Sequence, residues 1–172
     1  QVDNIRKLIK LDLGKLIIGL ASAITLFLSV LGAGLADVSG VPRVVDGDTI
    51  VIGKDRIRLH GIDAPEQRQT CSHHDLEWAC GEAATGALKE MVGDNSVTCR
   101  GDKRDRYDRL IAVCFVAGRN LNASMVRDGW AVAYRKYSTD YVAAERNAAA
   151  KLRGIWKGDF IRPWEWREKK RK

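Results

Sequence analysis

The sequence predicts a mainly β α+β domain, in which five short strands form a small closed barrel and three helices accompany it. Three observations support this class. Short apolar runs alternate with Gly- and Asp-containing turns, as in a meander of antiparallel strands. Apolar residues then recur at spacings of three and four, as in amphipathic helices. The chain has 172 residues, which is enough for one such domain with its own core and a terminal extension.

The strands are expected where short runs are apolar or alternate between polar and apolar residues. The predicted strands are residues 41–45, 49–52, 56–59, 96–100 and 110–116. Asp46-Gly47 is typical of a tight turn between the first two strands. Residues 110–116 are almost continuously apolar, which indicates burial on both faces. Residues 67–78 show little periodicity and are expected to form a loop.

The helices are expected at residues 81–92, 121–128 and 141–152. A glycine follows each of them, and Asn120 is a suitable N-cap for the second. The remaining residues, 161–172, form a Trp-containing tail that is expected to end in a solvated basic stretch. No internal repeat or second domain is recognisable. Five strands and three helices favour a barrel of the OB type over residues 37–160, and such barrels bind oligonucleotides.

Residues 16–36 form a charge-free, mostly apolar run that basic residues precede. A run of this length fits a secretory signal cleaved near Ala36, or a hydrophobic helix retained as a membrane anchor. The cleaved signal is favoured, and in both cases the domain is expected outside the cytoplasm. The protein would then be periplasmic or secreted, or anchored in the inner membrane with its domain outside.

All four cysteines follow this segment, which suggests two disulfides in an exported domain. Four cysteines allow three pairings. The favoured pairing joins Cys71 to Cys80 across a short loop, and Cys99 to Cys114 across two strands that flank one polar turn. The alternative is a zinc site that includes His73 and His74, although their spacing from the cysteines fits no common zinc pattern.

The net charge is +7, and residues 37–172 keep 25 Lys and Arg against 20 Asp and Glu. Hydrophobic residues make up 45% of the chain, so a disordered protein is excluded. A moderately basic domain favours anionic partners such as nucleic acid, phosphorylated substrates or an anionic membrane surface.

Acids and arginines are concentrated in three segments that would meet at one mouth of the barrel: residues 46–49, 58–66 and 105–109. Asp48 and Asp63 offer hard oxygen ligands for a metal ion. Arg58 and Arg109 suit a pair of guanidiniums that clamps a phosphodiester. Glu66 is the remaining carboxylate, which suits a base that activates water.

Each of these residues also has an ordinary structural explanation. The stretch from Arg58 to Glu66, taken alone, fits a polar turn with one ion pair. Asp48 could stabilise only its own turn, and Arg109 could merely flank a strand. One arrangement explains all of them together, and this favours a functional site.

The order and the spacing of these segments resemble those of the staphylococcal nuclease-like (thermonuclease) family over roughly residues 41–156. The matching segments are Val45-Asp46-Gly47-Asp48-Thr49, Arg58-Leu59-x-Gly61-Ile62-Asp63-Ala64-Pro65-Glu66, Asp105-Arg106-Tyr107-Asp108-Arg109-Leu110, Leu121-Asn122-x3-Val126-x2-Gly129 and Gly154-Ile155-Trp156. The Cys71 to Cys80 loop and Pro163-Trp164-x-Trp166-Arg167 resemble a bacterial branch with exported members.

The resemblance implies an OB-fold barrel and a Ca²⁺-dependent endonuclease that hydrolyses DNA and RNA without sequence specificity, leaving 3′-phosphate ends. The protein is also expected to be a monomer. The implied roles are phosphate binding and general-base catalysis by Arg58, Arg109 and Glu66, calcium binding by Asp48, Asp63 and the Ala64 carbonyl, and nucleotide binding by Tyr107 and Tyr134.

Two departures from the family pattern stand out. A Thr found in some members is Ala64 here, and the frequent Gly of one turn is Asp108, which could alter the turn or repel phosphate. The alternative function is a nucleic-acid-binding OB module without catalysis, because a fold alone does not imply an activity.

Overall fold

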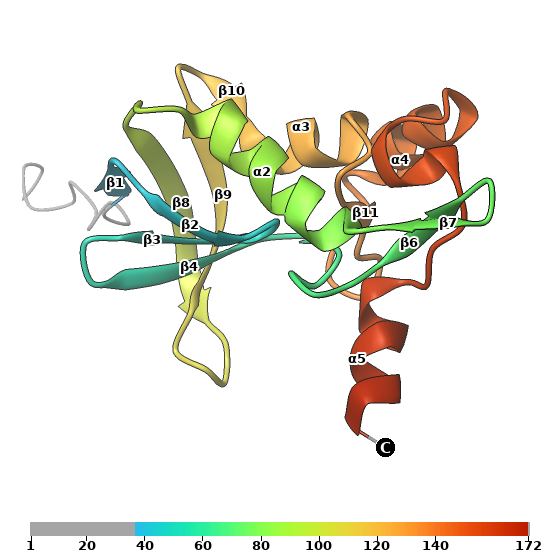
Figure 1. Cartoon of the computed structure of the whole chain (residues 1–172). Coiled ribbons are helices and arrows are strands. Elements are labelled where there is room, and N and C mark those ends of the chain that lie inside the picture. The colour runs from blue at the N-terminus through green and yellow to red at the C-terminus, as the bar shows by residue number, and fades with distance from the viewer. Residues whose placement is uncertain (1–36, 172) are drawn as a thin grey trace, which may run out of the picture. The chain divides into compact units, whose positions relative to one another are not determined.

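A curved, mostly antiparallel sheet is the centre of the fold (Figure 1). The computed structural model describes residues 37–171. The strands lie in the order β2-β3-β4-β9-β8-β1, and β10 pairs with β9. Their bounds are β1 Val38–Gly40, β2 Arg43–Asp46, β3 Thr49–Ile52, β4 Asp55–Leu59, β8 Val97–Arg104, β9 Leu110–Val116 and β10 Arg119–Asn120. Only β4 and β9 pair in parallel in this sheet.

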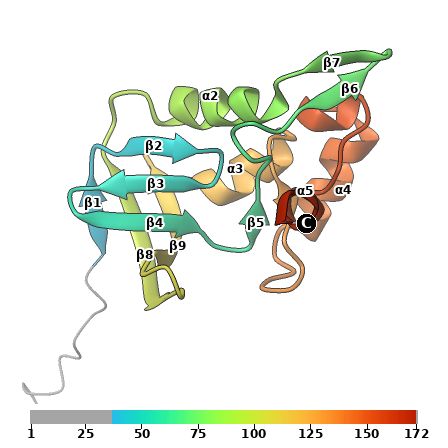
Figure 2. The ribbon, with the colours of Figure 1, turned by 60° about the horizontal axis from the view of Figure 1, so that its bottom comes forward.

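Two short two-stranded sheets and four α-helices complete the described part of the chain (Figures 1 and 2). The short strands are β5 (Ile62–Asp63) with β11 (Val132–Ala133), and β6 (Cys71–His73) with β7 (Leu76–Trp78). The helices are α2 (Cys80–Val92), α3 (Leu121–Arg127), α4 (Val142–Ala150) and α5 (Pro163–Arg171), with a short 3-10 turn η2 (Gly154–Lys157). The predicted α+β, mainly β class and its OB-like fold are confirmed.

The core lies between the concave sheet and helices α2 and α3. Ile50 and Ile57 from β3 and β4 are fully buried beside Leu88 of α2 and Leu121 of α3. In β9 the residues alternate between buried and half-buried, so the expected burial on both faces is only partly realised. Each large apolar side chain removed from water here contributes about 1.5–3 kcal/mol to folding.

Asn122, a fully buried polar residue of α3, fastens this helix to the sheet. Its side-chain amide donates to the carbonyls of His60 and Ala112, and its oxygen accepts from the Cys114 N–H. A buried amide with all these partners is stabilising, whereas an unpaired one would be costly. Asn122 therefore fixes where the chain leaves β4, just before the segment that carries Asp63.

The prediction of a loop at residues 67–78 is wrong, because β6 and β7 form a hairpin there. His74 and Asp75 make its two-residue turn with φ values of 50° and 62°. Such turns are usually recognised by Asn or Gly, which this one lacks. Periodicity could not show the strands either, since each has only three residues.

Three further differences concern the lengths and number of elements. The strand expected at 96–100 continues to Arg104, because its polar second half still pairs with β9 after an irregularity in register. Residues 38–40, which follow the apolar segment, form the edge strand β1. The tail adds a fourth α-helix, α5, which begins with Pro163, a residue well suited to the first position of a helix.

Both favoured disulfides are present, Cys71–Cys80 and Cys99–Cys114. Cys99 and Cys114 face each other in β8 and β9, with Cα atoms 4.0 Å apart. The zinc alternative is wrong, because both cysteines that it would use are joined to each other. No helix within residues 37–171 has the length and apolar character to cross a membrane. The signal or anchor expected at residues 1–36 lies outside the described residues.

Replacing Cys99 and Cys114 together by Ala should lower the free energy of unfolding by about 3 kcal/mol, because their disulfide closes a 15-residue loop in the unfolded chain. Urea denaturation measures this loss. The matched variant lacks Cys71 and Cys80, which close a shorter loop, and should lose slightly less. An unchanged midpoint for the Cys99/Cys114 variant would contradict the prediction.

Candidate active site

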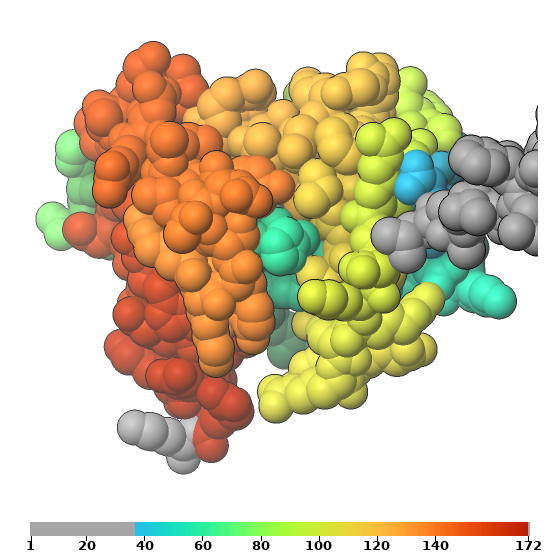
Figure 3. Space-filling model, turned by 180° about the vertical axis from the view of Figure 1, so that it is seen from behind, coloured from blue at the N-terminus to red at the C-terminus, as the bar shows by residue number. Residues whose placement is uncertain are grey.

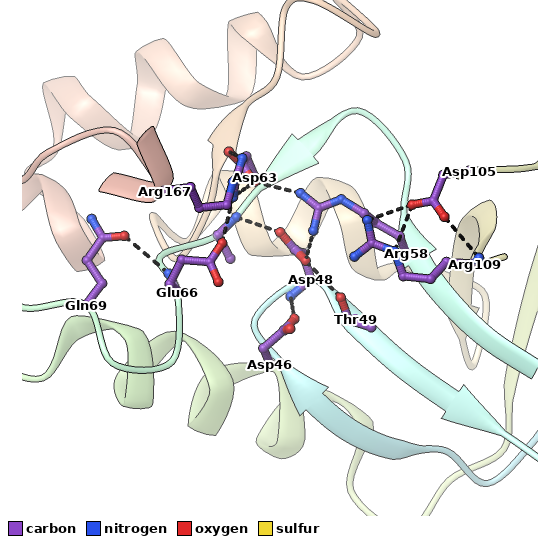
Figure 4. A network of polar contacts seen from close by, with 11 residues as sticks. Asp46, Asp48, Thr49, Arg58, Asp63, Glu66, Gln69, Asp105, Arg109 and Arg167 are labelled. Atoms are coloured by element: carbon purple, nitrogen blue, oxygen red, sulfur yellow. Dashed lines mark hydrogen bonds and ion pairs between the residues drawn. The ribbon is translucent and has the colours of Figure 1, made fainter. Parts of the chain in front are cut away.

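The predicted site residues converge where β4 ends and β5 begins (Figure 4). Asp48 lies in the turn between β2 and β3, Arg58 is on β4, and Asp63 is on β5. The pairing of β3 with β4 sets Thr49 opposite Arg58, which brings Asp48 to the same end of the sheet. In Figure 3 a notch opens here between the β8–β9 hairpin (yellow) and the segments coloured orange and red, with the β4–β5 segment at its floor.

Arg58 lies between the two carboxylates that were predicted to bind metal. Its Nη1 donates to Asp48 Oδ1, and its Nη2 donates to Asp63 Oδ1 at 2.6 Å. Asp48 is 3% exposed and Asp63 is 0% exposed. Two acids this deeply buried and this close repel each other unless a cation lies between them, and Arg58 supplies that cation.

Both carboxylate oxygens of Asp48 accept further hydrogen bonds. Its Oδ2 accepts from the Ala64 N–H at 2.9 Å, and its Oδ1 also accepts from the Thr49 hydroxyl at 3.1 Å. Asp46 accepts from the Asp48 N–H at 3.0 Å, which holds the turn. Asp48 is thus fixed on three sides, so its carboxylate direction is set before any ligand arrives.

Arg167, from the C-terminal helix α5, also reaches this site. Its Nη1 and Nη2 donate to Asp63 Oδ1 and Oδ2 at 3.0 and 2.8 Å. The same Nη1 donates to Glu66 Oε1 at 2.7 Å. Asp63 therefore lies between two guanidiniums, while Glu66, with its side chain 39% exposed, faces solvent at the edge of the site.

Burial and neighbouring charges both shift the pKa values of the buried groups in this site. Burial raises the pKa of Asp63, and the charge of Asp48 adds to this, whereas Arg167 and Arg58 lower it. Burial, together with the charge of Asp48, raises the pKa of Asp46 to about 6. Burial lowers the pKa of Arg58, but the charges of Asp48 and Asp63 outweigh it, so that pKa lies above its usual value.

Arg109 lies beside Arg58, just before β9, and is held by Asp105 (Figure 4). Its Nε and Nη2 donate to Asp105 Oδ2 at 2.8 and 2.6 Å. Burial opposes a low pKa for Asp105, yet the hydrogen bonds from Arg109 bring that pKa below its usual value. Both arginines predicted to clamp a phosphate are thus held by carboxylates, which orient them at the site mouth.

The two predicted nucleotide-binding tyrosines occupy different surroundings. Tyr107 is 64% exposed in the turn before β9, with the Arg109 guanidinium 5.5 Å from its ring centre. Tyr134 follows β11, and its N–H donates to the Gly61 carbonyl at 2.9 Å. Its ring stacks on Trp164, with centres 5.4 Å apart and planes 2° from parallel. Tyr107 is therefore open to a ligand, and Tyr134 is already covered on one face.

The donor set fits a divalent cation that prefers hard oxygens. Asp48 and Asp63 provide two buried carboxylates, and the Ala64 carbonyl is adjacent in the chain. Within residues 37–171 no three His, Cys, Asp or Glu side chains are gathered to hold a metal by themselves. A cation at this site would therefore need the backbone carbonyl and water to complete its shell, as Ca²⁺ commonly does.

Sequence reasoning missed three residues that organise the site. Arg167 was assigned to a solvated tail, and Gln69 to a loop, although Gln69 is fully buried below Glu66. Glu145 of α4 is 3% exposed, accepts from the Ala133 N–H, and pairs with Arg135 and Arg162. The only sequence signal for Arg167 was its place in the Pro163-Trp164-x-Trp166-Arg167 segment.

An OB-like fold with paired acids and arginines at one end is typical of proteins that bind nucleic acids. The family model described as Staphylococcal nuclease homologue matches residues 56–158. The chain belongs to the staphylococcal nuclease homologue family.

Relatives named for nuclease activity cover most of the chain. An "Uncharacterized endonuclease" of Escherichia coli O157:H7 is 38% identical over 144 residues, covering 78% of this chain and 88% of that protein. The "Micrococcal nuclease" of Shigella flexneri is 33% identical over 166 residues, or 86% and 89% of the two chains. The "Thermonuclease" of Staphylococcus intermedius is 30% identical over 167 residues, or 86% and 98%. These relatives support a nuclease, and hence a hydrolase, in general terms.

Replacing Gly81 by Ala should destabilise the site, because a Cβ there would lie 1.8 Å from the Glu66 carbonyl oxygen. We expect a loss of about 2–3 kcal/mol in the free energy of unfolding. Gly86 is in the same helix, and a Cβ there would meet nothing within 4 Å. Gly86→Ala should therefore gain up to about 1 kcal/mol. Thermal unfolding of both variants tests this, and equal effects would contradict it.

Asp108→Gly should stabilise the turn before β9 by about 0.5–1 kcal/mol, because Asp108 has a φ of 60° that glycine adopts more readily. The lost pair with Arg104 spans 3.7 Å at an 87% exposed side chain and contributes little. Asp94→Gly is the control, since Asp94 is exposed without a positive φ, and it should not gain stability. A destabilised Asp108→Gly variant in chemical denaturation would refute this account.

Proposed function

We propose that this protein is a Ca²⁺-dependent nuclease that hydrolyses phosphodiester bonds of DNA and RNA and leaves 3′-phosphate ends. The observation that carries the proposal is the Asp48–Arg58–Asp63 arrangement, with Glu66 and Arg109 beside it. An ion pair with only a structural role would not require five charged groups at the same end of the sheet. The family relationship supports the same reaction class.

Asp48, Asp63 and the Ala64 carbonyl would hold the calcium ion. The bound cation supplies a positive charge that stabilises the negative charge developing on the phosphate oxygens. In the free protein, the Ala64 N–H and the Thr49 hydroxyl already orient the Asp48 carboxylate. Asp48 would therefore need little rearrangement to bind the ion. Arg58 keeps the two carboxylates from repelling each other in the absence of the metal.

The two arginines bind the phosphodiester. Arg58 and Arg109 present planar guanidiniums, which form paired hydrogen bonds with phosphate oxygens and stabilise their added charge in the transition state. In the free protein Asp105 holds the Arg109 guanidinium by two contacts, which orient it. These contacts must weaken when a phosphate takes the place of the Asp105 carboxylate. The exposed Tyr107 ring offers a surface on which a base can stack without sequence readout.

Glu66 acts as the general base. Its side chain is 39% exposed, whereas those of Asp48 and Asp63 are 4% and 0% exposed, so water has access to Glu66. Glu66 accepts a proton from the attacking water, the water oxygen bonds to phosphorus, and the bond from phosphorus to the 5′ oxygen breaks. The departing 5′ oxygen keeps the electron pair of that bond and takes up a proton from solvent water. The products are a 3′-phosphate and a 5′-hydroxyl end.

We further propose that the domain lies outside the cytoplasm, either periplasmic, secreted, or attached to a membrane through residues 16–36. Two disulfides support an oxidising compartment. The protein is expected to act as a monomer. Cell fractionation followed by mass spectrometry of the mature N-terminus distinguishes these locations, and a protein confined to the cytosol would contradict all of them.

Purified protein should cleave DNA and RNA with Ca²⁺ and stop when EDTA removes the ion. Glu66→Gln should lower kcat by about 10²–10⁴-fold, because the amide cannot accept the proton from water. Glu90→Gln, an exposed position of α2, is the control and should keep full activity. Salt-sensitive binding without cleavage under any divalent ion would instead indicate the binding-only module. Full activity of Glu66→Gln would remove Glu66 from the mechanism.

A further inference from the structure

The C-terminal segment from Ile161 to Arg167 forms one wall of the candidate site, although it lies beyond residue 158, where the match to the family model ends. Figure 2 shows α5 beside β5, at the end of the sheet where the acids converge. The mechanism above uses no residue of this segment. The segment nevertheless holds Glu66 in two ways, directly through Arg167 and indirectly through Gln69.

The first contact is through the Glu66 side chain. Arg167 Nη1 donates to both Glu66 Oε1, at 2.7 Å, and Asp63 Oδ1, at 3.0 Å, so one nitrogen bridges the two acids. Arg167 Nη2 donates to the other oxygen of Asp63 at 2.8 Å. Asp63 is fully buried, and it therefore provides Arg167 with a fixed anchor from which to hold the more exposed Glu66.

The second contact is through the Glu66 backbone. The Glu66 N–H donates to Gln69 Oε1 at 3.2 Å, and Gln69 Nε2 donates to the Ile161 carbonyl at 2.6 Å. Gln69 is fully buried, so its amide cannot exchange these partners for water. The same segment thus holds Glu66 at its main chain and at its carboxylate.

The segment is itself firmly attached. Pro163 is buried, Trp164 stacks on Tyr134, and Arg162 pairs with the buried Glu145 at 3.4 Å. The guanidinium of Arg162 also lies 4.9 Å from the centre of the Trp156 ring. Arg167 therefore projects from a docked helix, and holding it in place requires little further loss of side-chain freedom.

We propose that Arg167 is a positioning residue of the hydrolytic site, which bridges Glu66 to Asp63 and thereby fixes the direction of the Glu66 carboxylate. This inference rests on the proposed role of Glu66 as the base that accepts a proton from water. A base must lie within hydrogen-bond reach of that water, and a displacement of about 1 Å can reduce the rate by about 10²-fold.

The bridge is compatible with a cation on Asp63. A carboxylate has about four acceptor positions, and Asp63 accepts one hydrogen bond from Arg58 and two from Arg167. Asp63 can therefore offer an oxygen to a cation and still accept from Arg167. The competing account is that Arg167 only replaces the cation and leaves when it binds. These two accounts differ in what happens to kcat once the protein is saturated with Ca²⁺.

The test compares Arg167→Met, Arg167→Lys and the control Arg171→Met, which removes one charge from the exposed end of the same helix. At saturating Ca²⁺ and substrate, Arg167→Met should lower kcat by about 10–100-fold while KM changes less than about threefold. Arg167→Lys should recover part of this loss, because an ammonium can still bridge the acids. Arg171→Met should behave as the unchanged protein, and thermal unfolding without metal verifies that each variant folds.

A second readout does not depend on activity. Calorimetric titration with Ca²⁺ should give Arg167→Met an affinity within about threefold of the unchanged protein, because its role is to direct Glu66. Full kcat at saturation together with a Ca²⁺ affinity raised tenfold or more would overturn the proposal in favour of competition with the metal. A raised KM with unchanged kcat would overturn it in favour of a substrate clamp.

A double-mutant cycle separates this inference from the proposed function. If Arg167 acts through Glu66, the Glu66→Gln/Arg167→Met variant should be no slower than Glu66→Gln alone. Multiplied losses in the double variant would show that Arg167 acts independently and would overturn the inference. An active Glu66→Gln protein would refute the proposed base itself, whereas an inactive Glu66→Gln with a fully active Arg167→Met would refute only the positioning role.

Discussion

The repulsion between two buried carboxylates is the constraint on which this site depends. Asp48 and Asp63 are nearly inaccessible to water. Two negative charges buried side by side would destabilise the fold if no positive charge lay between them. The Arg58 guanidinium between them makes the arrangement stable without a ligand. The same arrangement keeps two hard oxygen groups close together, which is what a divalent cation requires. The stability of the free protein and the placement of the oxygen groups that the proposed cation would use therefore come from one contact.

The fold serves this contact by fixing the ends of strands. The register of β3 with β4 brings Asp48 to Arg58, and the parallel register of β4 with β9 brings the turn of Arg109 alongside. Buried polar residues then secure the connections. Asn122 fixes the exit from β4, and Gln69 fixes the turn after Glu66. The charged groups are thus carried on rigid elements even where they sit next to turns.

Local signals in the sequence were sufficient for the main strands, the first three helices and the acids and arginines of the site. These features depend on short-range periodicity, turn residues and a specific order of motifs, all of which are visible along the chain. The β6–β7 hairpin was missed because its turn uses His74 and Asp75 in a conformation that other residues usually mark. Arg167 was missed because more than 100 residues separate it from Asp63, and only packing of α5 brings them together.

The parallel pairing of β4 with β9 has a consequence for folding kinetics. Ile57 and Leu110 are partners in this pair, so a long loop that includes all of α2 and β8 must close when the two strands join. Contacts of such large sequence separation form late and slow the folding of small domains. Arg58 and Arg109 come together only at this step. A partly folded chain therefore lacks the paired arginines, and the phosphate clamp proposed for them would form together with the completed sheet.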